Sequence, residues 1–150
     1  MGYIMELRKV LGSRPIIMVG ACVIVRNANG DILLQKRADT LDWGTIGGSL
    51  ELGESLEEAA ARELMEEAGL SAKSFRFVTL LSGQDMYYRY PHWDEVYNVM
   101  AVYEALDVIG TPIVNDDEGL ELKFFPVKGD WSVVNPFSRL ILQKAGYLQL

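Results

Sequence analysis

The segment from Gly48 to Leu70 reads GSLELGESLEEAAARELMEEAGL. Its part between residues 56 and 68 contains no glycine or proline and is rich in alanine, leucine, methionine and glutamate, which predicts a helix. With about 100° between successive helical residues, Glu63, Glu66 and Glu67 share one sector, and small apolar side chains occupy the neighbouring sector. Such a helix packs on a sheet by its apolar side and presents three carboxylates beside it.

The three carboxylates repel one another, so this helix face needs a compensating charge. Hard divalent cations, which prefer oxygen ligands, are one source of that charge. Arg62 lies beside the carboxylates in sequence and is able to hold one of them by a bidentate pair. Gly53 and the pair Gly47–Gly48 predict a tight loop that returns Glu54 to the side of the helix. The alternative, a solvated surface helix with ion pairs such as Arg62 with Glu66, does not explain the glycines.

With these glycines, the segment resembles the Nudix box, G-x5-E-x7-R-E-U-x-E-E-x-G-U, in which U is a bulky aliphatic residue. The matching positions are Gly48, Glu54, Arg62, Glu63, Leu64, Glu66, Glu67, Gly69 and Leu70. No defined position departs from the pattern, and chance agreement has a probability on the order of one in a hundred million at average residue frequencies. The resemblance implies the Nudix fold, an α/β/α sandwich with a mixed β-sheet flanked by helices.

The resemblance implies an enzyme that hydrolyses a diphosphate linked to another moiety, usually a nucleoside, by in-line attack of water on phosphorus. Mg²⁺ or Mn²⁺ is the implied cofactor, because metal ions neutralise charge on the phosphoryl oxygens and lower the pKa of the attacking water. The implied metal ligands are Glu63, Glu66 and Glu67, with Glu54 and the Gly48 carbonyl as additional ligands. Arg62 is expected to orient Glu63 rather than to touch the substrate.

The general base has several candidates, because its position varies within the family. Glu63 is one candidate, and Glu118, in the acidic run Asp116–Glu118, is another. The pair Asp94–Glu95 is a third candidate. For both downstream clusters, the alternative is an acidic loop that is simply solvated.

Aromatic residues gather in the segment 85–97, where they are candidates for stacking on a nucleobase. Tyr87 and Tyr88 follow the box at the spacing where a tyrosine is associated, within the family, with hydrolases of dinucleoside polyphosphates. The proline associated with ADP-ribose pyrophosphatases is replaced by Asp85 and Met86. We therefore favour dinucleoside polyphosphates, with ADP-ribose, nucleotide sugars, nucleoside triphosphates and capped or triphosphorylated RNA ends as alternatives. The same aromatic residues also suit a core strand or a dimer contact.

The rest of the chain predicts a mixed α/β domain. Strands are expected over residues 16–25, 32–36, 75–81, 96–103 and 120–127, and a short helix over residues 6–11. The turn Asn27–Asp31 predicts a β-hairpin between the first two strands, and a second hairpin is expected over residues 43–48. Asn135 as N-cap, Pro136 at the first helical position and Gly146 as a stop predict a closing helix over residues 137–145. With no linker or repeat, these elements predict a single domain over residues 1–150.

Charge and cysteine content exclude several classes of protein. The chain has 14 Lys and Arg against 21 Asp and Glu, a net charge of −7, and seven of these acids with a single base fall in Gly48–Leu70. A binder of duplex nucleic acid needs a basic surface, so that class is disfavoured. Cys22 is the only cysteine and cannot form an internal disulfide, which favours a reducing, cytoplasmic location. The longest apolar run, Ile16–Val25, is too short for a bilayer, which needs about 20 residues, so no membrane association is expected.

The expected partner is therefore a small-molecule nucleoside diphosphate derivative. Dimers are common in the family, so a homodimer is one expected assembly. Two other functions compete with hydrolysis. The first is a Nudix-fold sensor that binds a nucleotide without hydrolysing it. The second is an isomerase of isoprenoid diphosphates, which normally needs a catalytic cysteine and glutamate in motifs that this chain lacks.

Overall fold

The computed structural model describes residues 2–149. Its helices are α1 (Tyr3–Leu11), α2 (Leu56–Ala68) and α3 (Pro136–Lys144), with a 3₁₀ turn, η1, at Gln84–Met86. Its strands are β1 (Ile16–Ile24), β2 (Ile32–Arg37), β3 (Trp43–Gly44), β4 (Ile46–Ser49), β5 (Ser71–Leu81), β6 (Tyr87–Arg89), β7 (Glu95–Ile109) and β8 (Gly119–Phe125). The helix predicted over residues 56–68 is confirmed at those bounds. Within residues 2–149, none of the helices is long and apolar enough to cross a membrane.

The strands form two sheets. The larger sheet has the order β4-β1-β7-β5, and β6 pairs with β7 beside this path. β1 runs parallel to β7, with Ile16 opposite Val96 and Ile24 opposite Glu104, whereas the other pairings of this sheet are antiparallel. The sheet is therefore mixed, as predicted. The smaller sheet has the order β3-β2-β8 and is antiparallel.

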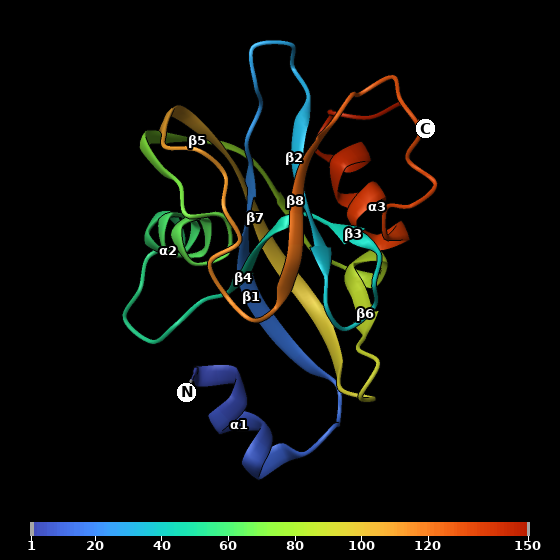
Figure 1. Ribbon diagram of the computed structural model, residues 1–150. Helices are drawn as coiled ribbons and strands as arrows, with labels where there is room; N and C mark the ends of the chain where they lie inside the picture. Colours follow the sequence, from blue (N-terminus) through green and yellow to red (C-terminus); the bar gives the residue numbers. More distant parts are fainter. Residues whose placement is uncertain (1, 150) are drawn as a thin grey trace.

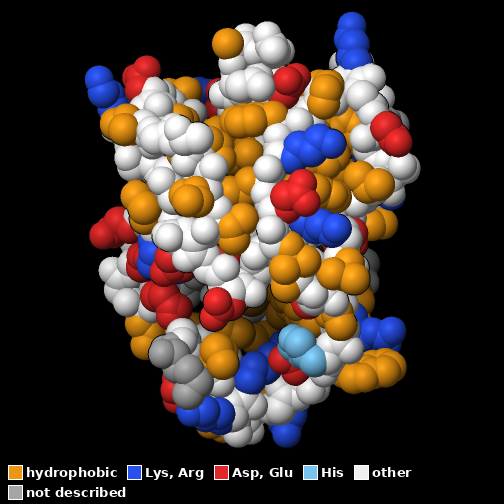
Figure 2. Space-filling view, viewed as in Figure 1, with side chains coloured by type: hydrophobic (Ala, Val, Ile, Leu, Met, Phe, Trp, Pro, Cys, Tyr) orange, Lys and Arg blue, Asp and Glu red, His pale blue; other side chains and the backbone are white. Residues whose placement is uncertain are grey.

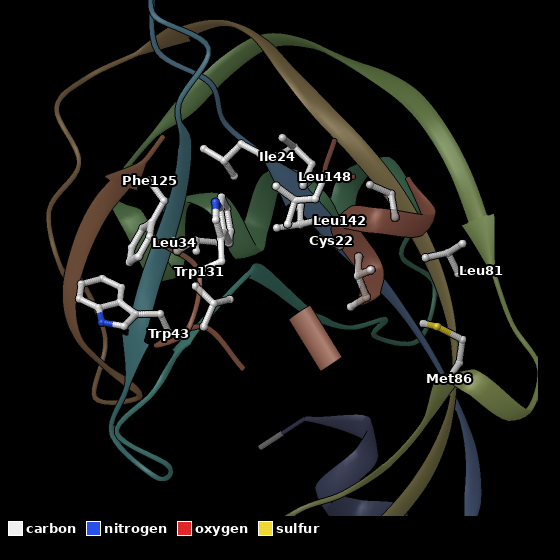
Figure 3. Packing of buried hydrophobic residues seen from close by; sticks show 14 residues of the cluster. Cys22, Ile24, Leu34, Trp43, Leu81, Met86, Phe125, Trp131, Leu142 and Leu148 are labelled. Carbon is white, nitrogen blue, oxygen red and sulfur yellow. The ribbon is translucent and has the colours of Figure 1, made fainter. Parts of the chain in front are cut away.

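Helices α2 and α3 cover the strands from two sides, which confirms the expected α/β/α arrangement (Figure 1). Successive residues of β1 face these two sides, so Cys22 belongs to one buried cluster and Val23 to the other. α3 contributes Leu142 to the first cluster (Figure 3), and α2 contributes Leu64 to the second. This double burial explains why β1 is apolar along nearly its whole length.

The predicted hairpin between the first two strands is wrong for most of its length. The turn itself forms, because the Asn27 Oδ1 accepts hydrogen bonds from the backbone N–H groups of Asn29 and Asp31, both at 3.0 Å. Leu33 N–H donates to the Val25 carbonyl at 2.9 Å, and beyond this bond β1 and β2 separate into different sheets. Most of β1, and the first three residues of β2, are apolar and buried on both faces, so separation between the layers buries more apolar surface than a hairpin with one solvated face.

The second expected hairpin, over residues 43–48, is also wrong. β3 pairs with β2 and β4 pairs with β1, so the chain crosses from one sheet to the other at Thr45. Gly47 makes the crossing possible, because its φ is +154° and a Cβ there would overlap the carbonyl oxygen of Ala21. The crossing places Gly47 and Gly48 next to α2, with which β4 is in contact.

β5 and β7 are longer than predicted. β5 begins at Ser71 and β7 continues to Ile109, and these two residues face each other in the antiparallel register. The polar start of β5 has low intrinsic strand propensity. Pairing with the neighbouring strand therefore outweighs the local preference.

Two caps delimit α2. The Ser55 Oγ accepts from Glu58 N–H at 3.1 Å, and the Glu58 Oε1 accepts from Ser55 N–H at 3.0 Å, which completes a capping box. At the other end, Gly69 adopts a left-handed φ of 66°, and its N–H donates to the Met65 carbonyl at 3.0 Å. The caps fix the helix ends, and burial of the apolar side of α2 in the core determines which side of the helix carries the carboxylates.

Replacement of Ser55 by alanine removes one half of the capping box, so we expect the free energy of unfolding to fall by about 1 kcal/mol. Urea unfolding followed by circular dichroism measures this change. Ser82→Ala, at an exposed serine outside any helix, is the control and should stay within about 0.5 kcal/mol of the wild type. Equal stability of Ser55→Ala and the wild type would show that the capping box contributes nothing.

Candidate active site

Arg62 lies at the centre of a group of carboxylates. Its Nε and Nη2 donate to the Oε2 and Oε1 of Glu54 at 2.7 and 3.0 Å, which makes a bidentate pair. Its Nη1 donates to the Glu63 Oε1 at 2.7 Å and to the Glu66 Oε2 at 3.2 Å. Its Nη2 also donates to the Ser49 carbonyl at 2.9 Å. Hydrogen bonding within the bidentate pair lowers the pKa of Glu54 and raises the pKa of Arg62, so both groups stay charged.

Glu67 is buried, with 3% of its surface exposed. Its carboxylate accepts from the Gln35 Nε2 at 2.9 and 3.1 Å and from the Gly47 N–H at 3.2 and 3.4 Å. Burial raises the pKa of Glu67 well above its ordinary value, and the nearby charge of Glu63 raises it further. The two donors therefore do not offset the cost of burying this carboxylate, which favours a positive charge beside it.

Glu63 lies against the backbone of Gly48. A Cβ at Gly48 would stand 2.6 Å from the Glu63 Cδ, so any side chain there would displace the carboxylate. Burial raises the pKa of Glu63, the bond from Arg62 opposes that shift, and the charges of Glu66 and Glu118 add to it. The glycine that opens the box is therefore required by the space that Glu63 occupies.

The loop before β8 brings a second acidic group to α2. Ile113 N–H donates to the Ala68 carbonyl at 2.9 Å, and the Asn115 Nδ2 donates to the Met65 carbonyl at 3.0 Å. Both bonds end on carbonyl groups in the last turn of the helix, where the Ala68 carbonyl has no partner within the helix and the Met65 carbonyl also accepts from Gly69 N–H. The resulting hollow is lined by Glu63, Glu66, Asn115, Asp116, Asp117 and Glu118. Figure 2 shows acidic side chains gathered on this side of the molecule, around α2.

The two downstream groups of candidates for the general base lie in different parts of the molecule. Glu118 lines the same hollow as Glu63. The pair Asp94–Glu95 instead faces α1 and β6, because Asp94 pairs with Arg8 at 3.6 Å and Glu95 accepts from the Tyr87 hydroxyl at 2.5 Å. Of the two downstream clusters, the structure brings only the one that contains Glu118 to the helix carboxylates.

An aromatic pocket adjoins the carboxylates. Its lining includes Tyr88, Tyr90, Asn98, Asn135 and Phe137, together with Gly47 and Gly48. The Tyr88 ring contacts those of Tyr90 and Phe137, with centroid separations of 4.9 and 5.3 Å. Because Gly47 also bonds to Glu67, the pocket and the carboxylates meet at one backbone segment.

The alternation of β6 separates the two tyrosines expected to bind substrate. Tyr88 lines the pocket. Tyr87 does not line it, and its ring instead packs on Tyr97 with a centroid separation of 5.2 Å.

Several polar side chains at the site carry no sequence signal of their position. Gln35 lies 32 residues from Glu67 in the chain and on a strand of the smaller sheet, so no local spacing connects it to the helix. Asn135 is predicted only as a helix N-cap, which it is, because its Oδ1 accepts from Phe137 N–H at 2.8 Å. Asn135 also lines the pocket, and this second role depends on tertiary packing.

The side chains that line the hollow carry carboxylate and amide oxygens, which are the ligand atoms that hard cations prefer. Within residues 2–149, no three Asp, Glu, His or Cys side chains form a ready-made metal cage. In this arrangement Arg62 engages Glu63 and Glu66, while Glu67 is bonded to Gln35 and Gly47. A cation at this site would therefore compete with Arg62 for the carboxylates.

A family model described as NUDIX domain matches residues 17–129. The chain belongs to the NUDIX family. The matched residues include the whole of α2 and the acidic loop before β8, whereas α1 precedes them and α3 follows them. The family membership expected from the Nudix box is thus confirmed over most of the chain.

Relatives match this NUDIX chain over part of their own length. A Bacillus subtilis (strain 168) protein named "Putative 8-oxo-dGTP diphosphatase" is 53% identical over 53 residues, which cover 35% of this chain and 36% of that protein. The NAD-capped RNA hydrolase NudC of Citrobacter koseri is 41% identical over 64 residues, which cover 41% of this chain and 25% of that protein. The matches therefore span about a third and a quarter of these relatives.

Solved structures match the fold over most of the chain. The MutT NUDIX hydrolase from Burkholderia pseudomallei superposes with a TM-score of 0.69 at 25% identity, covering 87% of this chain and 97% of that one. The MutT protein from Methanosarcina mazei Go1 gives a TM-score of 0.71 at 18% identity, covering 88% and 94%. The Nudix fold is therefore confirmed.

We expect Glu67→Gln to stabilise the protein at neutral pH in the absence of divalent cations. The pKa of Glu67 is raised in the folded state, so the folded protein binds more protons than the unfolded chain above the ordinary value of 4.5. Stability therefore falls as the pH rises from that value through the folded-state pKa. The uncharged amide escapes this loss, and we expect a gain on the order of 1 kcal/mol, or roughly 2–4 °C in Tm.

Thermal unfolding in EDTA between pH 5 and pH 8 measures this effect. Glu66→Gln is the matched control, because the Glu66 side chain on the same helix is 53% exposed and its charge costs little. A lower Tm of Glu67→Gln than of the wild type at pH 8 would contradict the argument from burial.

Proposed function

We propose that this protein is a metal-dependent Nudix hydrolase that cleaves the diphosphate linkage of a nucleoside diphosphate derivative by in-line attack of water on phosphorus. The observation that carries the proposal is the position of Gly47 and Gly48, which lie against the carboxylates of Glu67 and Glu63 and also line the aromatic pocket. A nucleoside in the pocket thereby has its phosphates next to the carboxylates. The relatives named as a diphosphatase and as a capped-RNA hydrolase support this reaction class.

In this proposal the helix carboxylates have the role of metal ligands. Glu63, Glu66 and Glu67 would hold Mg²⁺ or Mn²⁺, with Glu54 and the Gly48 carbonyl as further ligands. A bound divalent cation neutralises charge on the phosphoryl oxygens and lowers the pKa of the attacking water. Arg62 acts within the protein, because it holds Glu54 and directs the Glu63 carboxylate but does not line the aromatic pocket.

Glu118 is the general base that the arrangement favours. It lines the hollow beside Glu63 and Glu66. Its loop is braced by Asp116, whose Oδ1 accepts from the N–H groups of Glu118 and Gly119 at 3.2 and 3.1 Å. Glu63 is the weaker candidate, because Arg62 already engages its carboxylate.

The pocket offers aromatic side chains to a nucleobase of the substrate. Tyr88 and Phe137 offer ring faces on which a base stacks, and stacking does not require a particular base. The expectation of a dinucleoside polyphosphate depended on a tyrosine at the spacing of Tyr87 and Tyr88, and Tyr88, which lines the pocket, is consistent with it. A nucleoside with a polyphosphate chain, including dinucleoside polyphosphates and nucleotide-capped RNA ends, is therefore the substrate class that we favour.

The two alternative functions have less support. A nucleotide sensor without turnover would not require the full set of carboxylates, and all of them are present. An isomerase would need a reactive cysteine, whereas Cys22 is buried in β1 and burial raises its pKa to about 12.

Turnover should require a divalent cation and each helix carboxylate. We expect Glu63→Gln, Glu66→Gln and Glu67→Gln each to lower kcat at least about 100-fold, because each removes a charged metal ligand. Glu57→Gln, at an exposed glutamate on the same helix but outside the motif, is the control and should retain wild-type kcat.

The assay uses Mg²⁺ with dGTP, 8-oxo-dGTP, NAD, ADP-ribose and diadenosine tetraphosphate, and chromatography resolves phosphate, diphosphate and monophosphate products. EDTA should abolish product formation. Tight binding of one of these compounds without any turnover would favour the sensor and overturn the proposed hydrolysis.

Tyr88→Ala should raise the KM for the best substrate about tenfold, because base stacking on an aromatic side chain is worth roughly 1–3 kcal/mol. Tyr87→Ala is the matched control, since its ring lies outside the pocket, and its KM should equal that of the wild type. The opposite result, with only Tyr87→Ala impaired, would place the nucleobase on the other side of β6.

A further inference from the structure

Gln35 on β2 has an unusual hydrogen-bond arrangement. It is buried, with 4% of its surface exposed, and its Nε2 donates to both carboxylate oxygens of Glu67. Its Oε1 is also buried and has no hydrogen-bond partner among the residues that the structure describes, a distinction no other buried side-chain nitrogen or oxygen of those residues shares. A buried unpaired carbonyl lowers stability, so this orientation of the amide needs an explanation.

The orientation is set by Glu67. If the amide were turned over, the Gln35 Oε1 would face the carboxylate, and two acceptors would oppose each other. The amide also lies close to β8, where the absence of a side chain at Gly119 leaves it room, because a Cβ there would stand 3.0 Å from the Gln35 Oε1. Gln35 is therefore held between β8 and Glu67, with its donor group directed at the carboxylate.

Gln35 and Gly47 hold Glu67 from two different sheets. Gln35 belongs to β2 of the smaller sheet, and Gly47 belongs to β4 of the larger one. Each donor is shared between the two carboxylate oxygens, which fixes the plane of the carboxylate. An ionised carboxylate has about four acceptor positions, so two donors leave capacity for a further positive partner.

We propose that Gln35 is a positioning residue of the metal site, which sets the direction in which Glu67 presents its free acceptor positions to a divalent cation. This inference rests on the proposed function, because it requires Glu67 to be a metal ligand. Hydrogen-bond partners of metal ligands typically change metal affinity or activity 10- to 100-fold. A role in packing alone predicts that an apolar side chain of similar length serves equally well.

The test compares two substitutions at this position. Gln35→Met keeps the length of the side chain but removes the donor, and Gln35→Glu places a second carboxylate against Glu67. Binding of Mn²⁺ to the protein without substrate, measured by electron paramagnetic resonance of the free ion, is the first readout. The second readout is the Mg²⁺ concentration that gives half-maximal turnover.

We expect Gln35→Met to weaken Mn²⁺ binding about 10- to 100-fold and to raise the required Mg²⁺ concentration by a similar factor. Gln35→Glu should also weaken Mn²⁺ binding by at least tenfold, because its added acceptor replaces the donor to Glu67. Leu34→Ala is the matched control, since Leu34 is the fully buried neighbour on β2, outside the site. This control should lower Tm and leave Mn²⁺ affinity unchanged.

Wild-type Mn²⁺ affinity in Gln35→Met would overturn the inference and leave the proposed function intact. An equal loss of affinity in Leu34→Ala would also overturn it, because the effect would then follow from stability alone. If Gln35→Met does not fold, unchanged affinity in Gln35→Glu has the same meaning. A wild-type protein that neither binds Mn²⁺ nor turns over any nucleotide would overturn the proposed function itself.

Discussion

The bidentate pair between Arg62 and Glu54 is the interaction on which the carboxylate site depends. The same guanidinium bonds to the Ser49 carbonyl and to Glu63, so it joins the loop before α2 to the helix. Without the positive charge of Arg62, the carboxylates of the loop and the helix would repel one another with no opposite charge between them. One arginine cannot neutralise all the carboxylates around it, and the site therefore retains a strong negative charge.

The buried carboxylate of Glu67 shows the other side of this balance. Its buried position on α2 is costly for a charged group, and the donors from the two sheets compensate only in part. Such a group lowers the stability of the free protein and strengthens the attraction for a cation. Stability and the proposed activity thus make opposite demands on the same residue.

The parts of the fold that local signals specify are predicted well from the sequence. α2 has its predicted bounds because a capping box and a terminal glycine act within a few residues of the helix. The Asn27 turn also forms as predicted, but the choice of strand partners beyond it depends on contacts far away in the chain. The extension of β5 to Ser71 has the same origin, because β7 supplies its hydrogen bonds.

The candidate site follows the same division. The box holds Glu54, Arg62 and the three helix carboxylates within one short segment, so the sequence is enough to group them. Glu118 stays one of several base candidates until the loop before β8 is seen to cross the end of α2. Gln35 and the pocket-lining position of Tyr88 depend on how sheets pack and on which side of β6 faces inward, and no local pattern encodes either.

The uneven distribution of charge makes the protein an electric dipole. Seven of its 21 acidic residues lie in Gly48–Leu70, and the loop 116–118 adds three more on the same side of the molecule. The negative pole repels an approaching anionic nucleotide until bound cations neutralise part of the negative charge. Since the Debye length is about 8 Å at physiological salt, the field acts over the last stretch of approach. It therefore influences the orientation in which a phosphate chain docks more than the rate at which the nucleotide arrives from a distance.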